Sequence, residues 1–175
     1  MERVYARALE ALRSVSRHDF VSGSDLVPSI TGHSIPREET VSHILALLPE
    51  IEPDQVVMHV GGGSGYLAAV LSGLAHRVIH LEKNAVVAEA ARERFFRLGM
   101  HNVDQAPEPD PLCDLVLCTT FVTERGALAR LLREGGHLVC LEGRAGPVPS
   151  LAMFIRRDSR LERVRTLGWV DFNRN

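Results

Sequence analysis

The segment VVMHVGGGSGYLAAVL, residues 56–71, constrains the fold more than any other part of the chain. A short apolar run leads into the glycine-rich turn GGGSG, and small and apolar residues follow it. Glycines in such a turn allow a tight reversal and a close approach of the backbone to a ligand. The first turn of the next helix also offers free amide groups. The segment therefore predicts a strand, a ligand-binding turn and a helix.

Strands and helices alternate along the chain from this segment onward. The pattern predicts further strands at 77–82, 113–120 and 137–143, separated by helices at 66–74, 84–98 and 124–132. Asn84 suits an N-cap, and Gly99 suits a left-handed helix end. Two helices, 4–15 and 37–48, come first, and two strand-like runs, 151–157 and 161–172, come last. The order predicts an α/β fold with a doubly wound, mostly parallel, Rossmann-like sheet and antiparallel C-terminal strands.

Length and composition favour one domain over residues 1–175, with a helical and loop segment at 1–50 and a Rossmann-like core at 51–175. The formal net charge of −2 gives no electrostatic basis for binding nucleic acid or an acidic membrane surface. No apolar run reaches the roughly 18 residues of a membrane span, so we expect no membrane partner and a cytoplasmic location. The three cysteines lack metal-ligand spacing, and we expect no metal.

The turn and a distant acid together indicate an adenosine-containing cofactor. Glu82 ends the second strand, 21 residues after Gly61, where a carboxylate can accept hydrogen bonds from both ribose hydroxyls. The spacing from Gly63 through Gly65 to Ala68 also satisfies a dinucleotide pattern, so a nicotinamide or flavin enzyme stays open. S-adenosylmethionine fits as well, and the chain leaves no length for a second catalytic domain. The alternative without function is a tight turn that binds nothing.

The sequence resembles the protein-L-isoaspartate O-methyltransferase family over most of its length. The resemblance rests on ALEALRSVSRHDFV, VGGGSGYLAAVLSGLAHRVIHLEKN, CDLVLCTT, LLREGGHLVCLEG and LERVRTLGWVDF. It implies a class I methyltransferase that moves a methyl group from S-adenosylmethionine to an isoaspartyl carboxylate in damaged proteins or peptides. The implied cofactor-binding residues are His59, Gly61, Gly63, Gly65, Tyr66, Glu82 and Lys83.

Three positions depart from the family's pattern. Ser34 is the one hydroxyl left where the family has Thr-Ile-Ser-x-Pro, which makes it the catalytic candidate; a helix-capping serine is the alternative. His59 replaces the family's acid before the glycine turn, and it fits either a cofactor contact or a core histidine. The family's adenine-side acid has no clear equivalent, although Asp104 or Asp110 could serve.

These observations favour an enzyme without deciding the question. The first hypothesis is an S-adenosylmethionine-dependent carboxyl methyltransferase that acts on damaged protein. The second is a divergent, non-catalytic binding or interaction module, which could belong to a larger protein or assembly. The third is a methyltransferase for another substrate, such as RNA.

Overall fold

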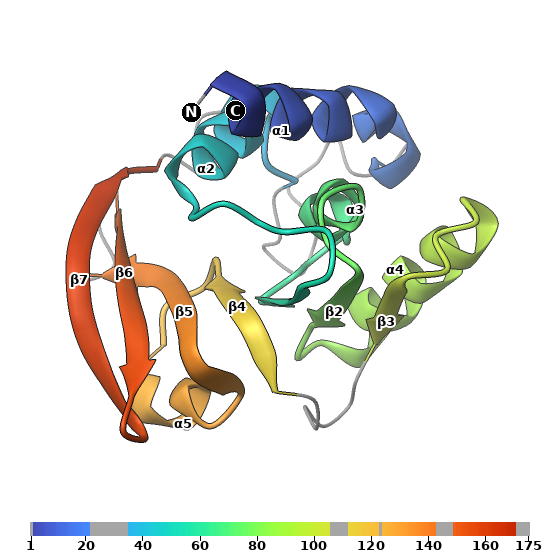
Figure 1. Ribbon diagram of the computed structural model, residues 1–175. Helices are drawn as coiled ribbons and strands as arrows, with labels where there is room; N and C mark the ends of the chain where they lie inside the picture. The colour runs from blue at the N-terminus through green and yellow to red at the C-terminus, as the bar shows by residue number, and fades with distance from the viewer. Residues whose placement is uncertain (1, 22–34, 106–111, 123, 143–148, 171–175) are drawn as a thin grey trace.

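The computed structural model describes residues 2–21, 35–105, 112–122, 124–142 and 149–170, and the side chains from residue 6 onward. A seven-stranded sheet forms its centre, in the order β3-β2-β1-β4-β5-β6-β7 (Figure 1). The helices are α1 (Glu2–Ser14), the 3-10 helix η1 (Arg17–Phe20), α2 (Glu38–Leu47), α3 (Tyr66–Ser72), α4 (Ala85–Arg97) and α5 (Arg125–Ala129). The strands are β1 (Val56–Val60), β2 (Arg77–Leu81), β3 (Val103–Gln105), β4 (Cys113–Cys118), β5 (Leu132–Glu142), β6 (Ser150–Arg157) and β7 (Arg160–Trp169).

The sheet is parallel from β3 through β5, and its last two strands are antiparallel. β1 lies between β2 and β4, and both pairings are parallel. β6 pairs with β5, and β7 with β6, in antiparallel register. Asp158 and Ser159 join β6 to β7 with φ of 48° and 63°, as a two-residue hairpin turn with positive φ at both positions requires. The predicted fold class is confirmed.

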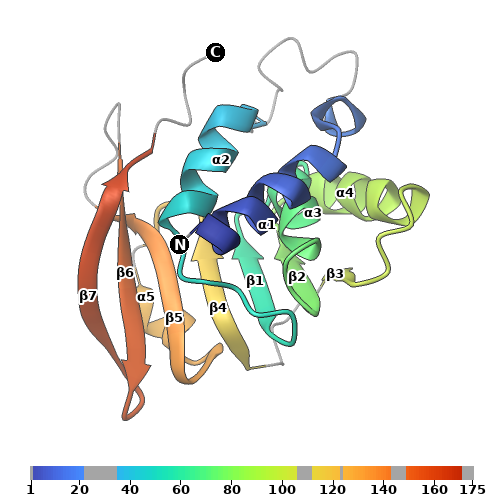
Figure 2. The ribbon, with the colours of Figure 1, turned by 45° about the horizontal axis from the view of Figure 1, so that its top comes forward.

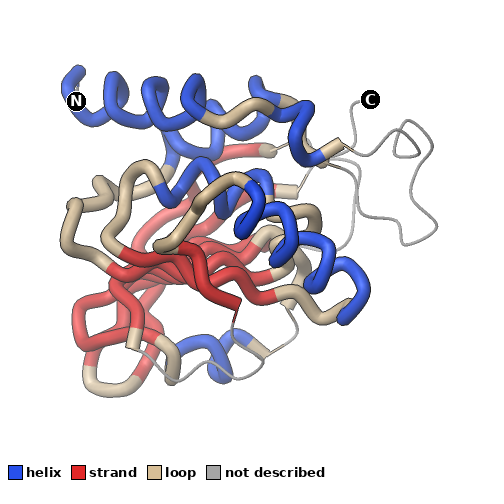
Figure 3. Tube along the Cα trace, turned by 90° about the vertical axis from the view of Figure 1, so that its right-hand side faces the viewer, coloured by secondary structure: helices blue, strands red, loops and turns tan. Residues whose placement is uncertain are grey.

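The described helices cover the two faces of the sheet unequally. Figure 2 shows α1, α2, α3 and α4 in front of the strands and α5 behind them, and Figure 3 shows the same layers from the side. Side chains from α1 to α4 share one apolar cluster with Val57, Val78 and Leu115. Met58 and Val116 face the other way and share a second cluster with Leu128 of α5. Alternate residues of each strand therefore enter different cores.

The region around α5 differs from the sequence prediction. The helix ends at Ala129 instead of 132, because Leu132 is fully buried and pairs with Cys113 as the first residue of β5. Residues 134–136, between the predicted helix and the strand predicted at 137–143, form an irregularity inside β5, where the register with β4 shifts between Cys113 and Leu115. Gly135 has a φ of +79°, which favours glycine at that irregularity. Burial of Leu132 outweighs the helical pattern of the sequence.

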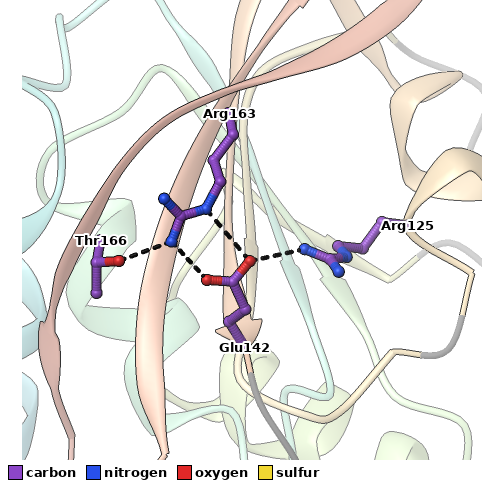
Figure 4. Close-up of polar contacts among 4 residues, drawn as sticks. All are labelled: Arg125, Glu142, Arg163 and Thr166. Carbon is purple, nitrogen blue, oxygen red and sulfur yellow. Dashed lines mark hydrogen bonds and ion pairs between the residues drawn. The ribbon is translucent and has the colours of Figure 1, made fainter.

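A charged cluster links the C-terminal strands to the end of β5; it consists of Arg125, Glu142, Arg163 and Thr166. Glu142 accepts a hydrogen bond from Arg125 at 3.1 Å and another from Arg163 at 2.7 Å (Figure 4). Arg163 also donates to Thr166 Oγ1 at 2.7 Å. The Arg125 guanidinium lies 5.0 Å from the ring centroid of Phe154. The hydrogen bond from Arg163 is the main cause that lowers the pKa of Glu142. Arg163 of the C-terminal strands thus lies on a solvated strand face, with its charge paired.

Candidate functional site

The glycine turn connects β1 to α3 in a left-handed backbone conformation. Gly61, Gly63 and Gly65 have φ of +75°, +52° and +90°, values that side chains with a Cβ adopt only with strain. The amides of Gly61 and Gly62 both donate to the carbonyl of Leu81, at 2.9 and 3.2 Å. This pair of bonds anchors the turn to the end of β2, directly before Glu82.

The glycines of the turn differ in what surrounds them. A Cβ on Gly65 would lie 2.5 Å from Phe95, and one on Gly61 would lie 2.8 Å from Thr120. A Cβ on Gly62 would overlap the imidazole of His80. A Cβ on Gly63 would meet no described atom within 4 Å. Packing within the protein therefore requires three of these glycines to be small, and Gly63 is the one that faces open space.

An open cleft of about 1570 Å³ runs along the carboxyl ends of β1, β2 and β4. This edge of the sheet is where open α/β folds bind ligands. Of the residues predicted to hold a cofactor, six line the cleft: His59, Gly61, Gly63, Tyr66, Glu82 and Lys83. Gly65 is buried against Phe95 and is not among the lining residues. The catalytic candidate Ser34 lies outside the described residues, as does Asp110.

Glu82 is fixed between the turn and the start of α4. Its Oε2 accepts from the amide of Gly63 at 2.9 Å, and its Oε1 accepts from the amide of Asn84 at 2.8 Å. Asn84 in turn caps α4, because its side chain accepts from the amides of Val86 and Val87, which confirms the predicted N-cap. Each carboxylate oxygen has further lone pairs, so Glu82 can still accept hydroxyl donors from the cleft.

His59 is buried, with 2% of its surface exposed, and it is neutral. Burial is the main cause that lowers the pKa of His59 to about 3, and the neighbouring His80 adds to the effect. Its Nε2 lies 2.9 Å from the hydroxyl of Thr119, which follows β4. A neutral imidazole cannot supply the fixed negative charge that the family's acid has at this position.

His80 is a second buried histidine beneath the turn, and the sequence reasoning did not identify it. It lies opposite His59 in the β1–β2 register, and the two ring centroids are 6.4 Å apart. The side-chain amide of Gln105 donates to His80 Nδ1 at 3.3 Å, so the ring proton resides on Nε2. Burial lowers the pKa of His80. The sequence does carry a signal for His80: it is a histidine in an otherwise apolar strand, two residues before Glu82.

Tyr66 lines the cleft but is fully buried. Its ring packs against Phe20 with centroids 5.6 Å apart, and no described residue hydrogen-bonds its hydroxyl. Burial is the first cause that raises the pKa of Tyr66 to about 12, and Glu38 acts in the same direction. The ring is therefore part of the core, and its predicted cofactor contact stays a prediction.

The end of β4 supplies cleft residues that the sequence reasoning missed. Thr119, Thr120 and Phe121 all line the cleft, and Phe121 is 42% exposed. Two threonines directly after a buried strand were the available signal. Asp104, one of the two acids considered for the adenine side, pairs with Arg77 and is not among the lining residues.

Comparison with known proteins relates this chain to methyltransferases. Residues 3–107 match the family model described as Protein-L-isoaspartate(D-aspartate) O-methyltransferase. A protein-L-isoaspartate O-methyltransferase of Methylorubrum populi is 32% identical over 95% of this chain and 85% of its own length. One from Syntrophobacter fumaroxidans is 33% identical over 76% of this chain and 69% of its own.

Solved structures share the fold at lower identity. A protein-L-isoaspartate O-methyltransferase superposes with a TM-score of 0.77 at 19% identity, covering 97% of this chain and 62% of that one. A Plasmodium falciparum protein assigned as a beta-aspartate methyltransferase, in complex with S-adenosyl-L-homocysteine, gives 0.64 at 17% identity. It covers 97% of this chain and 91% of its own.

Proposed function

We propose, because this chain belongs to the protein-L-isoaspartate(D-aspartate) O-methyltransferase family, that it methylates isoaspartyl carboxylates in damaged proteins or peptides. The methyl donor is S-adenosylmethionine. The observation that carries the proposal is the pair formed by Gly63, open to the cleft, and Glu82, whose carboxylate is fixed beside it. The pair lies at the carboxyl edge of the sheet, where the fold binds ligands.

The described residues fit such a donor. Glu82 is held by two backbone amides with lone pairs to spare, so it can accept from the two ribose hydroxyls. Gly63 leaves room for the backbone to approach the ligand, since no described atom lies near its missing side chain. Lys83 and Asn84 line the same side of the cleft and border the adenosine part. Phe121, exposed at the opposite side, gives the substrate an apolar surface.

The reaction requires little acid–base catalysis from the protein. S-adenosylmethionine supplies a methyl group on a sulfonium, which is already a good leaving group. The substrate carboxylate is already ionised, so its oxygen forms the new bond to carbon without a general base. The side chains therefore have to bind, orient and exclude water. The neutral state of His59 and the high pKa of Tyr66 are compatible with this requirement.

Calorimetric titration with S-adenosylhomocysteine tests the proposal at the level of binding. Wild type should bind, and Glu82→Ala should bind about tenfold to a hundredfold more weakly, because hydrogen bonds to a charged acceptor are lost. Glu93→Ala, which removes an exposed carboxylate of α4 that is not among the cleft-lining residues, is the matched control and should bind as wild type does. Equal affinities for Glu82→Ala and wild type would remove Glu82 from the site.

Methylation of an isoaspartyl peptide tests the substrate. Wild type should transfer label from S-adenosylmethionine to the isoaspartyl peptide but not to the same peptide with normal aspartate. Binding without transfer would support the non-catalytic module, and transfer only to RNA would support the third hypothesis. In the same assay, a Ser34→Ala variant with an unchanged rate would remove Ser34 from catalysis.

Location and partners follow from the proposal and stay predictions. A protein or peptide is the expected partner, as the family's substrate class indicates. No helix within the described ranges is long and apolar enough to cross a membrane. We propose the cytoplasm as the location of the reaction, in line with the expectation from the sequence.

A further inference from the structure

A hydroxyl at the end of β4 reaches across to the glycine turn. The amide of Thr119 donates to the carbonyl of Val60 at 3.1 Å, which extends the β1–β4 pairing by one residue. The side-chain Oγ1 of Thr119 donates to the carbonyl of Gly61 at 3.3 Å. Thr119 therefore fixes the first carbonyl of the turn from the strand opposite to the one that carries Glu82.

The hydrogen-bond network determines the tautomer of His59. The Thr119 hydroxyl has one proton, and it is used in the bond to Gly61. With that proton on Gly61, the contact of 2.9 Å between His59 Nε2 and Thr119 Oγ1 is a donation from the imidazole N–H. His59 orients the hydroxyl, and the hydroxyl orients the Gly61 carbonyl. The other ring nitrogen, Nδ1, is left as a buried acceptor without a described donor.

Two uncharged acceptors remain on this side of the turn. The Gly61 carbonyl has a second lone pair, and among the described residues only Thr119 donates to it through a side chain. His59 Nδ1 is the other acceptor. β1 lies between β2 and β4, so these acceptors and Glu82 flank the turn on opposite sides. A ligand whose ribose is held by Glu82 can extend its other end across the turn toward Gly61 and Thr119.

We propose that Thr119 and His59 are positioning residues for the amino-acid end of the cofactor. They hold the Gly61 carbonyl so that its free lone pair accepts a hydrogen bond from the ligand's ammonium group. The inference rests on the proposed function, because it assumes an adenosyl ligand with an amino-acid tail. The oriented dipoles of His59, Thr119 and the Gly61 carbonyl then bind the positively charged ammonium group, in place of a carboxylate.

Two ligands that differ only at that end test the inference. S-adenosylhomocysteine carries the amino-acid tail, and 5′-methylthioadenosine has the same nucleoside and thioether without it. Thr119→Val should lower the affinity for S-adenosylhomocysteine about tenfold, which is the effect of losing one hydrogen bond at the tail. The affinity for 5′-methylthioadenosine should change by less than about twofold. Thr119→Ser, which keeps the hydroxyl, is the control and should restore the affinity.

The same comparison applies to His59. His59→Leu should reproduce the selective loss, whereas His59→Gln should recover most of it, because a side-chain amide can donate to Thr119. A purely structural role would instead lower the affinity for both ligands together and would not distinguish Gln from Leu. If Thr119→Val does not fold, Thr119→Ala carries the same expectation.

The outcomes separate this inference from the proposed function. If wild type binds neither ligand, the proposed function fails, and the inference fails with it. If wild type binds both ligands and folded Thr119→Val binds S-adenosylhomocysteine equally well, the inference alone is overturned. An equal loss for both ligands also overturns it. A loss confined to S-adenosylhomocysteine supports it.

Discussion

Lowering the pH from about 7.5 to about 5 should destabilise the protein through His59. In the folded chain, burial and then His80 lower the pKa of His59 to about 3, whereas an unfolded histidine titrates near 6.5. At pH 5 the unfolded chain binds a proton at this position and the folded chain does not. The contribution of His59 to stability is therefore complete above pH 6.5, and it is lost progressively as the pH falls toward 3.

The size of the effect follows from the two pKa values. A pH of 5 lies about 1.5 units below the pKa of the unfolded histidine, and each unit corresponds to about 1.4 kcal/mol. His59 alone should therefore cost about 2 kcal/mol of unfolding free energy at pH 5. His80, whose pKa burial also lowers, acts in the same direction. Glu82 opposes the effect at His80, because its negative charge favours the protonated ring.

Urea unfolding followed by circular dichroism measures this free energy at both pH values. His59→Gln is the control, because glutamine keeps a donor for Thr119 and does not titrate. Between the two pH values, wild type should lose about 2 kcal/mol more unfolding free energy than His59→Gln does. The contributions of His137 and of the carboxylates are the same in both proteins, so they cancel in this difference. Equal pH dependence in the two proteins would show that His59 is solvated or protonated in the native state, and the argument from burial would be wrong.

Four substitutions test the local geometry by urea unfolding. Gly65→Ala should cost about 2–4 kcal/mol, from its positive φ and from overlap with Phe95. Gly63→Ala should cost only about 1–2 kcal/mol, because only the backbone is strained; equal losses would contradict the assigned packing. Asn84→Ala should cost about 1 kcal/mol through loss of the α4 cap, and an unchanged midpoint would exclude the cap. Arg163→Ala should leave the unfolding midpoint nearly unchanged, since its ion pair is half-exposed and screened by solvent; a clear drop in the midpoint would mean that the cluster in Figure 4 is cooperative.

Most of the fold could be predicted because its signals are local. The alternation of strands and helices, the cap at Asn84 and the left-handed Gly99, with a φ of +66°, follow from residues close together in the sequence. The helix predicted at 124–132 was too long because Leu132 is placed by burial in the sheet, and burial depends on strands far away in the chain. The 3-10 helix η1 at Arg17–Phe20 also lacked a periodic signal, since it is a single short turn.

The site was less predictable, because its contacts depend on strand register. Sequence reasoning named Glu82 and the glycines of the turn as cofactor contacts, which stay predictions; it did not foresee that Gly65 packs against Phe95. The pairing of His59 with His80 requires the β1–β2 register, and the contact with Thr119 requires that of β1 with β4. A single sequence does not encode these registers directly.

Glu82 also disfavours one class of ligand at the glycine turn. A dinucleotide would place its pyrophosphate on the free amides of a glycine-rich turn. Here the amide of Gly63 already has an anionic partner within the protein, and the Asn84 amide beside it has the same one. A phosphate bound there could not use these two amides as donors, and it would be repelled by the negatively charged carboxylate of Glu82. The turn matches a dinucleotide spacing by sequence, but at Gly63 its amide faces a carboxylate, which disfavours a pyrophosphate at that position and suits the adenosyl group without phosphate that we propose.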